Sequence, residues 1–362
     1  MISPRAFDHM LLPEEKGETS ASVSIGDLNG DGYPDLVLGK GRHWPLLDRV
    51  LLNDGKGHFT AHDLGDTPDR TYSAALADVD RDGNLDVVIS NDAPDPKLIY
   101  LNDGKGNFRM AETFGDPSWV TGYVTPADLN GDGYPDLIAA NRGDPPKDPH
   151  ASFVCLNDGK GHFPSCTALE GTQSATIIVA ADFDGDGAID LFVPHRDVGQ
   201  SVIFWNDGKG RFPQKTPVGP ATSSARAAAA GDLNGDGRPD IVVGDERQGT
   251  FIYLNVGKRN FSEPILLFAK QRTPCAVAIA DLNRDGKLDV VVGNVETPGS
   301  VFFNDGTGTN FREVRWGDGK GSVYGIAIGD LDGDGWPDIA AARSDAPNAV
   351  WFSTILDPKR YR

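Results

Sequence analysis

One nine-residue acidic segment, D-x-[DN]-x-D-G-x-x-D, occurs seven times in this chain and constrains its fold more than any other feature. The copies begin at Asp27, Asp78, Asp128, Asp182, Asp232, Asp281 and Asp330. Successive copies start 51, 50, 54, 50, 49 and 49 residues apart. A nearly fixed period indicates one repeat architecture rather than a series of unrelated domains. The sequence therefore predicts a single domain over residues 1–362.

Each acidic segment has the composition of a calcium-binding loop. Oxygen-bearing side chains stand at positions 1, 3, 5 and 9, and the glycine at position 6 permits a tight turn. Together with the carbonyl of position 7, they supply the hard oxygen ligands that Ca²⁺ prefers. The sequence predicts up to seven structural Ca²⁺ sites. Their ligands are expected to be Asp27, Asn29, Asp31, Tyr33, Asp35, Asp78, Asp80, Asp82, Asn84, Asp86, Asp128, Asn130, Asp132, Tyr134, Asp136, Asp182, Asp184, Asp186, Ala188, Asp190, Asp232, Asn234, Asp236, Arg238, Asp240, Asp281, Asn283, Asp285, Lys287, Asp289, Asp330, Asp332, Asp334, Trp336 and Asp338.

Two other interpretations of the acidic segments are less consistent with the sequence. An EF-hand requires a glutamate at position 12, but that position is apolar in every copy, from Leu38 to Ala341. Asx-turns form without any metal, but they do not explain why 24 carboxylates gather in seven short loops. Such clusters repel one another unless a cation neutralises them. Bound calcium would also offset most of the formal net charge of −19.

Short apolar segments flank each acidic loop and indicate β-strands, as at 23–25 and 36–38. A second motif, N-D-G-x-G-x-F, follows each of the first six loops and is typical of a hairpin. It begins at Asn53, Asn102, Asn157 and Asn206, and in looser form at Asn255 and Asn304. Each period then holds four strands. The predicted fold class is all-β, a seven-bladed β-propeller of four-stranded blades.

The chain has seven acidic loops but only six hairpins, so the last blade is one strand short. Residues 5–12 resemble the strand that opens at Phe59. We expect them to complete the blade formed by about 320–356, which would join the two termini and leave no open sheet edge.

The acidic loops and N-D-G hairpins resemble FG-GAP (VCBS) repeats, the units of integrin α-subunit propellers. The resemblance covers nearly the whole chain and implies a propeller fold. Similar propellers occur in adhesion receptors, a calcium-containing mushroom lectin, polysaccharide lyases and a sugar dehydratase. The fold by itself does not choose among these functions.

The repeat diverges on the face opposite the acidic loops. Extra residues fall between the second and third strands of blades 1 and 3, a region that carries His43, Trp44, Arg142 and His150. Insertions on one face of a repeat protein often mark a binding face. Two sets of positions are expected to ring the axial mouth there. The first strands begin at Ala21, Tyr72, Gly122, Thr176, Arg226, Cys275 and Tyr324, and the second strands end at Lys40, Asn91, Asn141, His195, Asp245, Asn294 and Arg343.

Three functions remain open from the sequence. The favoured one is a single axial site for a polar ligand such as a carbohydrate, because ligand sites need convergent polar groups in a concavity. The residues expected to bind it are Lys40, His43, Trp44, Arg70, Asn91, Trp119, Tyr123, Asn141, Arg142, Asp245 and Asn294.

The second hypothesis is a lyase or dehydratase in the same cavity. Arg226 or Arg343 would stabilise developing negative charge. His195 would be the base, and Tyr72 or Tyr324 the acid. The third hypothesis is a scaffold that docks a protein partner and needs no pocket.

Composition limits the partners and the compartment. The acidity argues against nucleic acid, and no apolar run suggests membrane insertion. Three cysteines are too few for a disulfide framework, although Cys155 and Cys166 flank one hairpin and form a possible pair. Weak extracellular-type calcium sites favour a secreted, periplasmic or cell-surface protein. No signal peptide is seen at the start of this chain.

Overall fold

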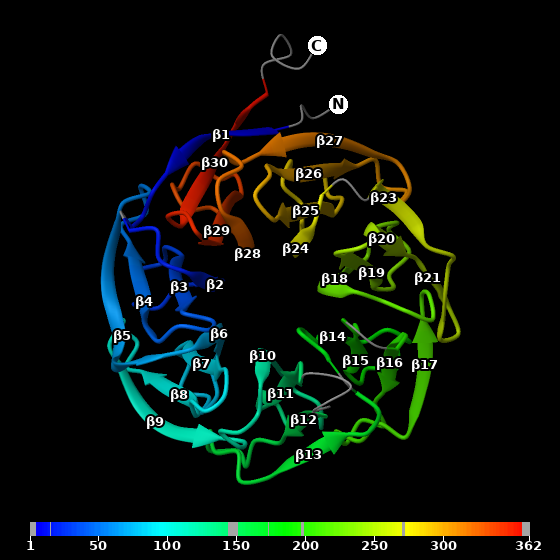
Figure 1. Cartoon of the computed structure of the whole chain (residues 1–362), viewed down its shortest axis with the longest axis horizontal. Coiled ribbons are helices and arrows are strands. Elements are labelled where there is room, and N and C mark those ends of the chain that lie inside the picture. The colour runs from blue at the N-terminus through cyan, green and yellow to red at the C-terminus, as the bar shows by residue number, and fades with distance from the viewer. Residues whose placement is uncertain are drawn as a thin grey trace.

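The computed structural model describes residues 5–14, 16–143, 151–172, 174–196, 199–269 and 272–356. These residues form seven four-stranded antiparallel sheets arranged as blades around a central axis (Figure 1). The predicted seven-bladed propeller is confirmed. Among the described residues, no helix has the length and hydrophobicity of a membrane span.

In each of the first six blades, the strands pair in chain order, with the first strand nearest the axis (Figure 1). Blade 1 consists of β2 (Ser20–Gly26), β3 (Asp35–Lys40), β4 (Leu46–Asn53) and β5 (Phe59–Asp69). Blade 2 consists of β6 (Thr71–Ala77), β7 (Asp86–Asn91), β8 (Lys97–Asn102) and β9 (Phe108–Phe114). Blade 3 consists of β10 (Thr121–Ala127), β11 (Asp136–Asn141), β12 (Ser152–Cys155) and β13 (Cys166–Leu169).

Blade 5 also carries a small additional hairpin, β21–β22, before its outer strand. Blade 4 consists of β14 (Val179–Ala181), β15 (Asp190–Val193), β16 (Ser201–Trp205) and β17 (Gln214–Val218). Blade 5 consists of β18 (Ala225–Gly231), β19 (Asp240–Asp245), β20 (Gly249–Tyr253) and β23 (Ile265–Ala269), and its additional hairpin of β21 (Asn255–Gly257) and β22 (Asn260–Phe261). Blade 6 consists of β24 (Pro274–Ala280), β25 (Asp289–Asn294), β26 (Gly299–Asn304) and β27 (Phe311–Trp316).

The two ends of the chain meet in the seventh blade, as expected. Its strands are β28 (Ser322–Gly329), β29 (Asp338–Ser344), β30 (Ala349–Ile355) and β1 (Arg5–Leu11). Strand β1 runs antiparallel to β30 and forms the outer edge of the blade (Figure 1). The Arg5 side chain donates a hydrogen bond from Nε to Ser353 Oγ at 2.8 Å. The ring is thereby closed by strand pairing between residues that lie far apart in sequence.

The hydrophobic core lies between neighbouring blades rather than inside any single blade. In one such cluster, Leu36 and Leu38 of blade 1 pack with Val350 and Phe352 of blade 7. The second strand of every blade is buried along its whole length, as in β3 and β29. Burial on both faces explains why these strands read as continuous apolar runs.

The hairpin asparagines join each blade to the one before it. Asn157 Nδ2 in blade 3 donates to Val79 O in the acidic loop of blade 2 at 2.9 Å. It also lies 3.1 Å from Pro135 O in its own loop. The same pair of bonds recurs at Asn53, Asn102, Asn206, Asn255 and Asn304. In blade 7, Ser353 stands at the position of the asparagine, and its backbone N donates to Asp338 Oδ1 of the same blade at 2.8 Å.

The Cys155–Cys166 pair forms a disulfide between β12 and β13, and the two residues are directly opposite in the strand register. The third cysteine, Cys275, is a buried free thiol.

Candidate functional site

Backbone N–H groups order the side chains of each acidic loop. In the first loop, Asp27 accepts hydrogen bonds from the amides of Gly30 and Gly32 at 2.8 and 2.9 Å. Asn29 Oδ1 accepts from Asp31 N at 3.0 Å. Gly32, at position 6, has φ of +86°, a conformation that favours glycine. The turn therefore holds several oxygen atoms close together on one exposed loop.

The aspartate at position 9 anchors the loop to the sheet. Asp35 is fully buried, and its two carboxylate oxygens accept from Leu28 N at 2.9 Å and Asn53 N at 2.7 Å. Burial raises its pKa to about 6, although these two hydrogen bonds act in the opposite direction. The equivalent aspartate has the same role in every blade. Sequence reasoning predicted that position 9 is a calcium ligand but not that it links the loop to the hairpin.

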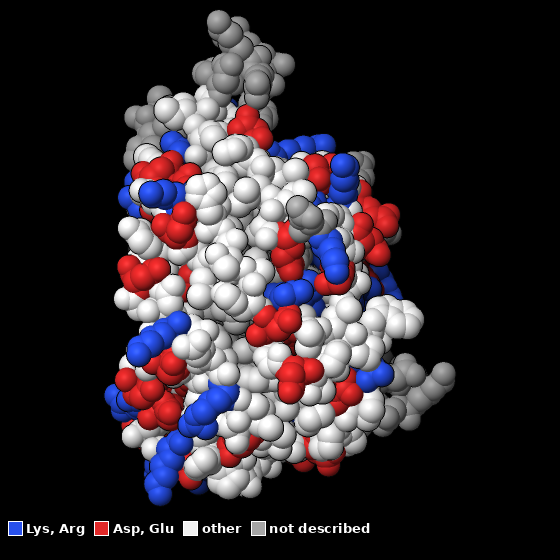
Figure 2. Space-filling view, turned by 90° about the vertical axis from the view of Figure 1, so that its left-hand side faces the viewer, with Lys and Arg blue, Asp and Glu red and all other residues white. Residues whose placement is uncertain are grey.

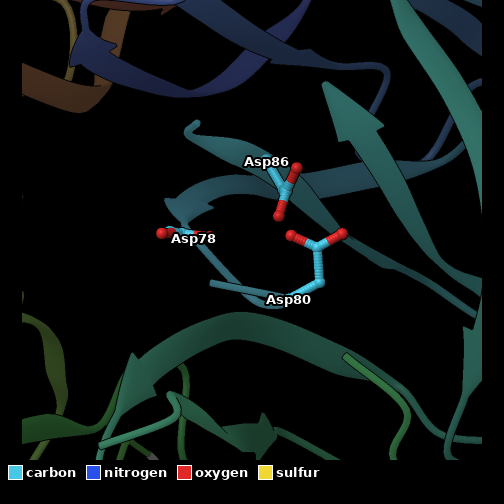
Figure 3. A group of neighbouring side chains, drawn as sticks. All are labelled: Asp78, Asp80 and Asp86. Carbon is cyan, nitrogen blue, oxygen red and sulfur yellow. The ribbon is translucent and has the colours of Figure 1, made fainter. Parts of the chain in front are cut away.

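Three loops bring the carboxylates of positions 1, 3 and 9 within 4.8 Å of one another. Figure 3 shows this group in blade 2, where the carboxylates of Asp80 and Asp86 face each other. Asp78 Oδ1 is buried and has no hydrogen-bond partner among the described residues. A divalent cation would satisfy this oxygen and offset the repulsion, and an all-oxygen donor set fits Ca²⁺. The residues present therefore fit the predicted ion.

The loops differ in the basic side chains around them. Arg259 of blade 5 donates from Nε to Asp184 Oδ2 in the blade 4 loop at 2.7 Å. Arg238 forms an ion pair with Asp236 inside the blade 5 loop. The first and third loops have no such ion pair among the described residues, so the negative charge of the seven loops is unevenly compensated.

The axial mouth is a small cavity of about 40 Å³ on the axis. It is lined by Ala21, Arg42, Tyr72, Tyr123, Arg142, Thr176, Arg196, Arg226, Cys275 and Tyr324. Six of the seven predicted first-strand positions are in this list, while at the seventh Tyr123 takes the place of Gly122. A second cavity of about 200 Å³ shares four of these residues and continues between the innermost strands.

Arginines and tyrosines are interleaved in the mouth. The Arg42 guanidinium lies 3.8 Å from the Tyr324 ring centroid and 5.4 Å from that of Tyr72. Arg142 lies 4.9 Å from the Tyr72 ring and pairs with Asp92 at 2.9 Å. Burial raises the pKa of Tyr72, which keeps its hydroxyl protonated at neutral pH. The mouth therefore presents cations and neutral hydroxyl groups.

Tyr123 closes the floor of the mouth. Its hydroxyl lies 2.9 Å from Ala21 O and 3.0 Å from Tyr324 O, so a side chain from blade 3 reaches backbone carbonyls of blades 1 and 7. Burial raises the pKa of Tyr123, so the hydroxyl remains a donor. The side chain crosses the axis and separates the mouth from the rest of the channel.

The predicted second-strand positions do not line the mouth, which corrects one expectation. Lys40, Asn91, Asn141, His195, Asp245, Asn294 and Arg343 are all buried. The amide of Asn141 donates to Ala151 O at 2.9 Å, and Asn91 and Asn294 bond the carbonyls of Pro96 and Pro298 similarly. The turn after the second strand leaves backbone groups that need partners. The three asparagine side chains supply such partners.

The charged members of this set are neutralised locally. Lys40 Nζ lies 3.1 Å from Glu14 and 3.0 Å from Glu18. Arg343 donates from Nη1 to Asp318 at 2.7 Å. The residues named for catalysis are consequently divided: Tyr72, Tyr324 and Arg226 line the mouth, whereas His195 and Arg343 do not.

The remaining predicted residues lie in several different places. His43 and Trp44 are exposed, and a His43 ring nitrogen lies 3.1 Å from the Tyr72 hydroxyl. Arg70 pairs with Asp95. Trp119 stacks on Phe153 at a centroid distance of 4.0 Å and lines a lateral cavity instead of the mouth. His150 lies outside the described residues.

Sequence reasoning missed two arginines of the mouth. Arg42 lies two residues after Lys40, and Arg196 lies one residue after His195, the predicted ends of two second strands. Basic residues just beyond that position were the available signal, and Arg142 is a third example.

Lateral cavities between blades were also not predicted. Three such cavities, of about 520, 550 and 390 Å³, lie between blades 2 and 3, 3 and 4, and 4 and 5. Asp245 lines the last of these.

Comparison with known proteins agrees with the repeat seen in sequence and structure. The model of the FG-GAP-like repeat matches residues 27–89, 78–139, 128–193, 182–243, 232–292 and 281–341. The chain belongs to the FG-GAP-like repeat family. Each match begins at one acidic loop and ends in the strand that follows the next acidic loop. The family repeat therefore spans the interface between two blades.

Two curated relatives match part of this FG-GAP chain. A Plasmodium yoelii yoelii T-cell immunomodulatory protein homolog is 25% identical over 190 residues, which is 43% of this chain. Human integrin alpha-7 is 32% identical over 143 residues, or 34% of this chain. The matches cover only 27% and 12% of those relatives.

Solved structures share the fold at low identity. An Agrocybe aegerita lectin, described as recognising non-reducing terminal N-acetylglucosamine, superposes with a TM-score of 0.62 at 22% identity. That match covers 91% of this chain and 86% of the lectin. BBS1N, solved in complex with ARL6DN, gives a TM-score of 0.65 at 14% identity and covers 99% of both chains.

Proposed function

We propose that this chain is a calcium-stabilised propeller that binds one polar ligand, a carbohydrate, at the axial mouth on the face opposite the acidic loops. The observation that carries the proposal is the convergence on one cavity of arginine, tyrosine and threonine side chains from separate blades. A few converging polar groups in a concavity are typical of ligand sites. Because the residues differ from blade to blade, the arrangement supports one axial site rather than seven equivalent ones.

Calcium has a structural role in this proposal. Position 9 links each acidic loop to a hairpin, and the hairpin asparagine links it to the preceding blade. An ion held by positions 1, 3, 5, 7 and 9 would therefore stabilise the junction between blades. The disulfide and the expected weak affinity of such loops support a location outside the cytosol, where calcium is abundant.

The similarity to a lectin that recognises N-acetylglucosamine is compatible with carbohydrate binding, but at 22% identity it concerns the fold alone.

Elimination chemistry at the same mouth is the second candidate. Its support is the contact between His43 and the Tyr72 hydroxyl beside Arg142, since a neutral imidazole can act as a base. Burial and the neighbouring arginines lower the pKa of His43. Docking of a protein partner is the third candidate function.

The test of the axial site uses the whole chain in millimolar calcium and a panel of neutral and acidic oligosaccharides. Binding is measured by calorimetry, and products are followed by the absorbance of unsaturated sugars. Arg226→Gln and Tyr324→Ala should each weaken binding about tenfold or more. Lys56→Ala, on the face with the acidic loops, is the control. Unchanged binding in the Arg226→Gln, Tyr324→Ala double variant would place the site elsewhere, such as a lateral cavity.

The calcium role has a separate test. Chelation with EDTA should lower the melting temperature by about 10 °C or more, because the ions bind only the folded chain. Re-addition of calcium should restore it. Coincident melting curves, with metal analysis confirming removal, would contradict a structural role for calcium.

A further inference from the structure

The axial mouth carries an excess of positive charge inside a strongly acidic protein. Among the residues that the structure describes, four arginines line it and no aspartate or glutamate does, although the chain has a formal net charge of −19. Two carboxylates lie behind the lining, where Asp92 pairs with Arg142 and Glu246 pairs with Arg226. Such a local reversal of sign attracts anions to the site.

Arg42 is the centre of this excess charge. It is half-buried between the rings of Tyr324 and Tyr72, and it forms no ion pair with any described residue. Stacking occupies the face of the guanidinium, whereas its several N–H donors lie along the edge, where Arg42 also hydrogen-bonds the side chains of Tyr324 and Tyr72. Arg142 contributes a second donor, since its Nε is buried without a hydrogen-bond partner among the described residues. A buried donor of this kind is costly unless a ligand pairs with it.

The size of the mouth limits what can enter it. A volume of about 40 Å³ is far below the roughly 300–1,000 Å³ of pockets that enclose a whole small-molecule ligand. The mouth is therefore better matched to a small group such as a carboxylate than to an enclosed sugar ring. Tyr123 blocks passage further along the axis. A ligand must therefore insert one small group and leave its ring on the outer face, where Trp44, 69% exposed and two residues from Arg42, offers a surface for stacking.

We propose that the axial mouth binds an anionic group of its ligand, a carboxylate or a sulfate carried by a sugar, through Arg42 and Arg142. This inference rests on the proposed function, because it assigns the ligand class of the same site. Arginine pairs with planar or tetrahedral oxyanions through parallel charge-assisted hydrogen bonds. The ligand class is therefore acidic carbohydrate rather than a neutral terminal sugar.

The test compares probes that differ only in charge. The whole chain in millimolar calcium is titrated with an oligogalacturonate, with its methyl ester, and with sulfated and unsulfated forms of one neutral oligosaccharide. The acidic probes should bind at least about tenfold more tightly than their uncharged counterparts, since paired charges contribute strongly when desolvated. The sulfated and carboxylated probes distinguish the two anionic groups.

Variants connect the charge preference to the mouth. Arg42→Gln should remove about a factor of ten in affinity for the acidic probes and reduce the affinity for the methyl ester by a smaller factor. Arg42→Lys keeps the charge and should retain part of the preference. Arg315→Gln is the matched control, because it removes the same charge from an exposed side chain of β27. Melting curves verify that each variant is folded.

The outcomes separate the two proposals. Equal affinity for acid and ester, or no binding of any acidic probe, overturns the assignment of an anionic group. If Arg226→Gln and Tyr324→Ala still weaken a neutral probe in that case, the axial site itself stands. If acidic probes bind but all mouth variants behave as wild type, both the anionic mouth and the proposed axial site are wrong.

Discussion

At the scale of single residues, His195 is buried, and neither of its ring nitrogens has a hydrogen-bond partner among the described residues. It is 5% exposed. Burial, and secondarily the charge of Lys215, lowers its pKa. The folded protein therefore favours the neutral imidazole, and protonation opposes folding.

The sign of the pH dependence follows from this shift. The pKa is lower in the folded than in the unfolded chain, so the unfolded chain binds more protons. The stability contributed by neutral His195 is present above the unfolded pKa, about 6.5, and is lost as pH falls through that value toward the folded pKa. Urea unfolding between about pH 7.5 and 5 should show a smaller loss of stability for His195→Gln than for wild type. Parallel curves would contradict the prediction.

The same scale shows what could be inferred from sequence about the site. Tyr72, Arg226 and Tyr324 were placed correctly because the first strands repeat regularly along the axis, so a fixed offset from the acidic loop gives the same location in every blade. Lys40 and Arg343 were misplaced because their orientation depends on how the following turn satisfies its backbone groups. Arg42 could not be placed, since it enters the mouth from an irregular loop with φ of +51°.

At the element scale, the hairpin is a connector between blades as well as a turn. The N-D-G motif predicted the turn and the number of strands, but its asparagine side chain bonds a loop in the preceding blade. That contact spans more than 70 residues of sequence and depends on the radial arrangement of the blades. The elements and their order could therefore be predicted from the motifs, whereas the bonds between elements could be seen only in the structure.

Asn157→Ala is expected to weaken the junction between blades 2 and 3. The change leaves the carbonyls of Val79 and Pro135 without this donor, and the bond to Val79 is buried. Loss of a buried partner costs about 1–3 kcal/mol, measurable as a lower free energy of unfolding in urea. Asn107→Ala is the control, because Asn107 is exposed and its side chain donates to Asp103 within the blade 2 hairpin. Equal effects of the two substitutions would show that the inter-blade bond contributes nothing specific.

At the scale of the whole molecule, the ring is held by interfaces between blades and closed by one strand. Each core cluster lies between two neighbouring blades, so no blade has a complete core of its own. Figure 2, which views the rim, shows acidic and basic side chains interspersed toward both faces, with a largely uncharged band between them. The surface seen in this view provides no extended patch of one charge, in contrast to the arginines of the axial mouth.

Deletion of residues 1–12 should therefore affect the entire ring. Strand β1 supplies the outer strand of blade 7, and Phe7, 2% exposed, packs in the cluster between blades 6 and 7 with Trp316 and Trp351. Termini tolerate truncation unless they are part of a sheet. Removal of β1 exposes the edge of β30, which can then pair with other chains. The truncated chain should melt at a lower temperature and form oligomers in light scattering. Phe7→Ala keeps the strand and should destabilise the protein without oligomerisation, by about 3–5 kcal/mol for a buried aromatic residue. A truncated chain that stayed monomeric and melted like wild type would mean that the pairing of β1 with β30 does not hold the ring closed.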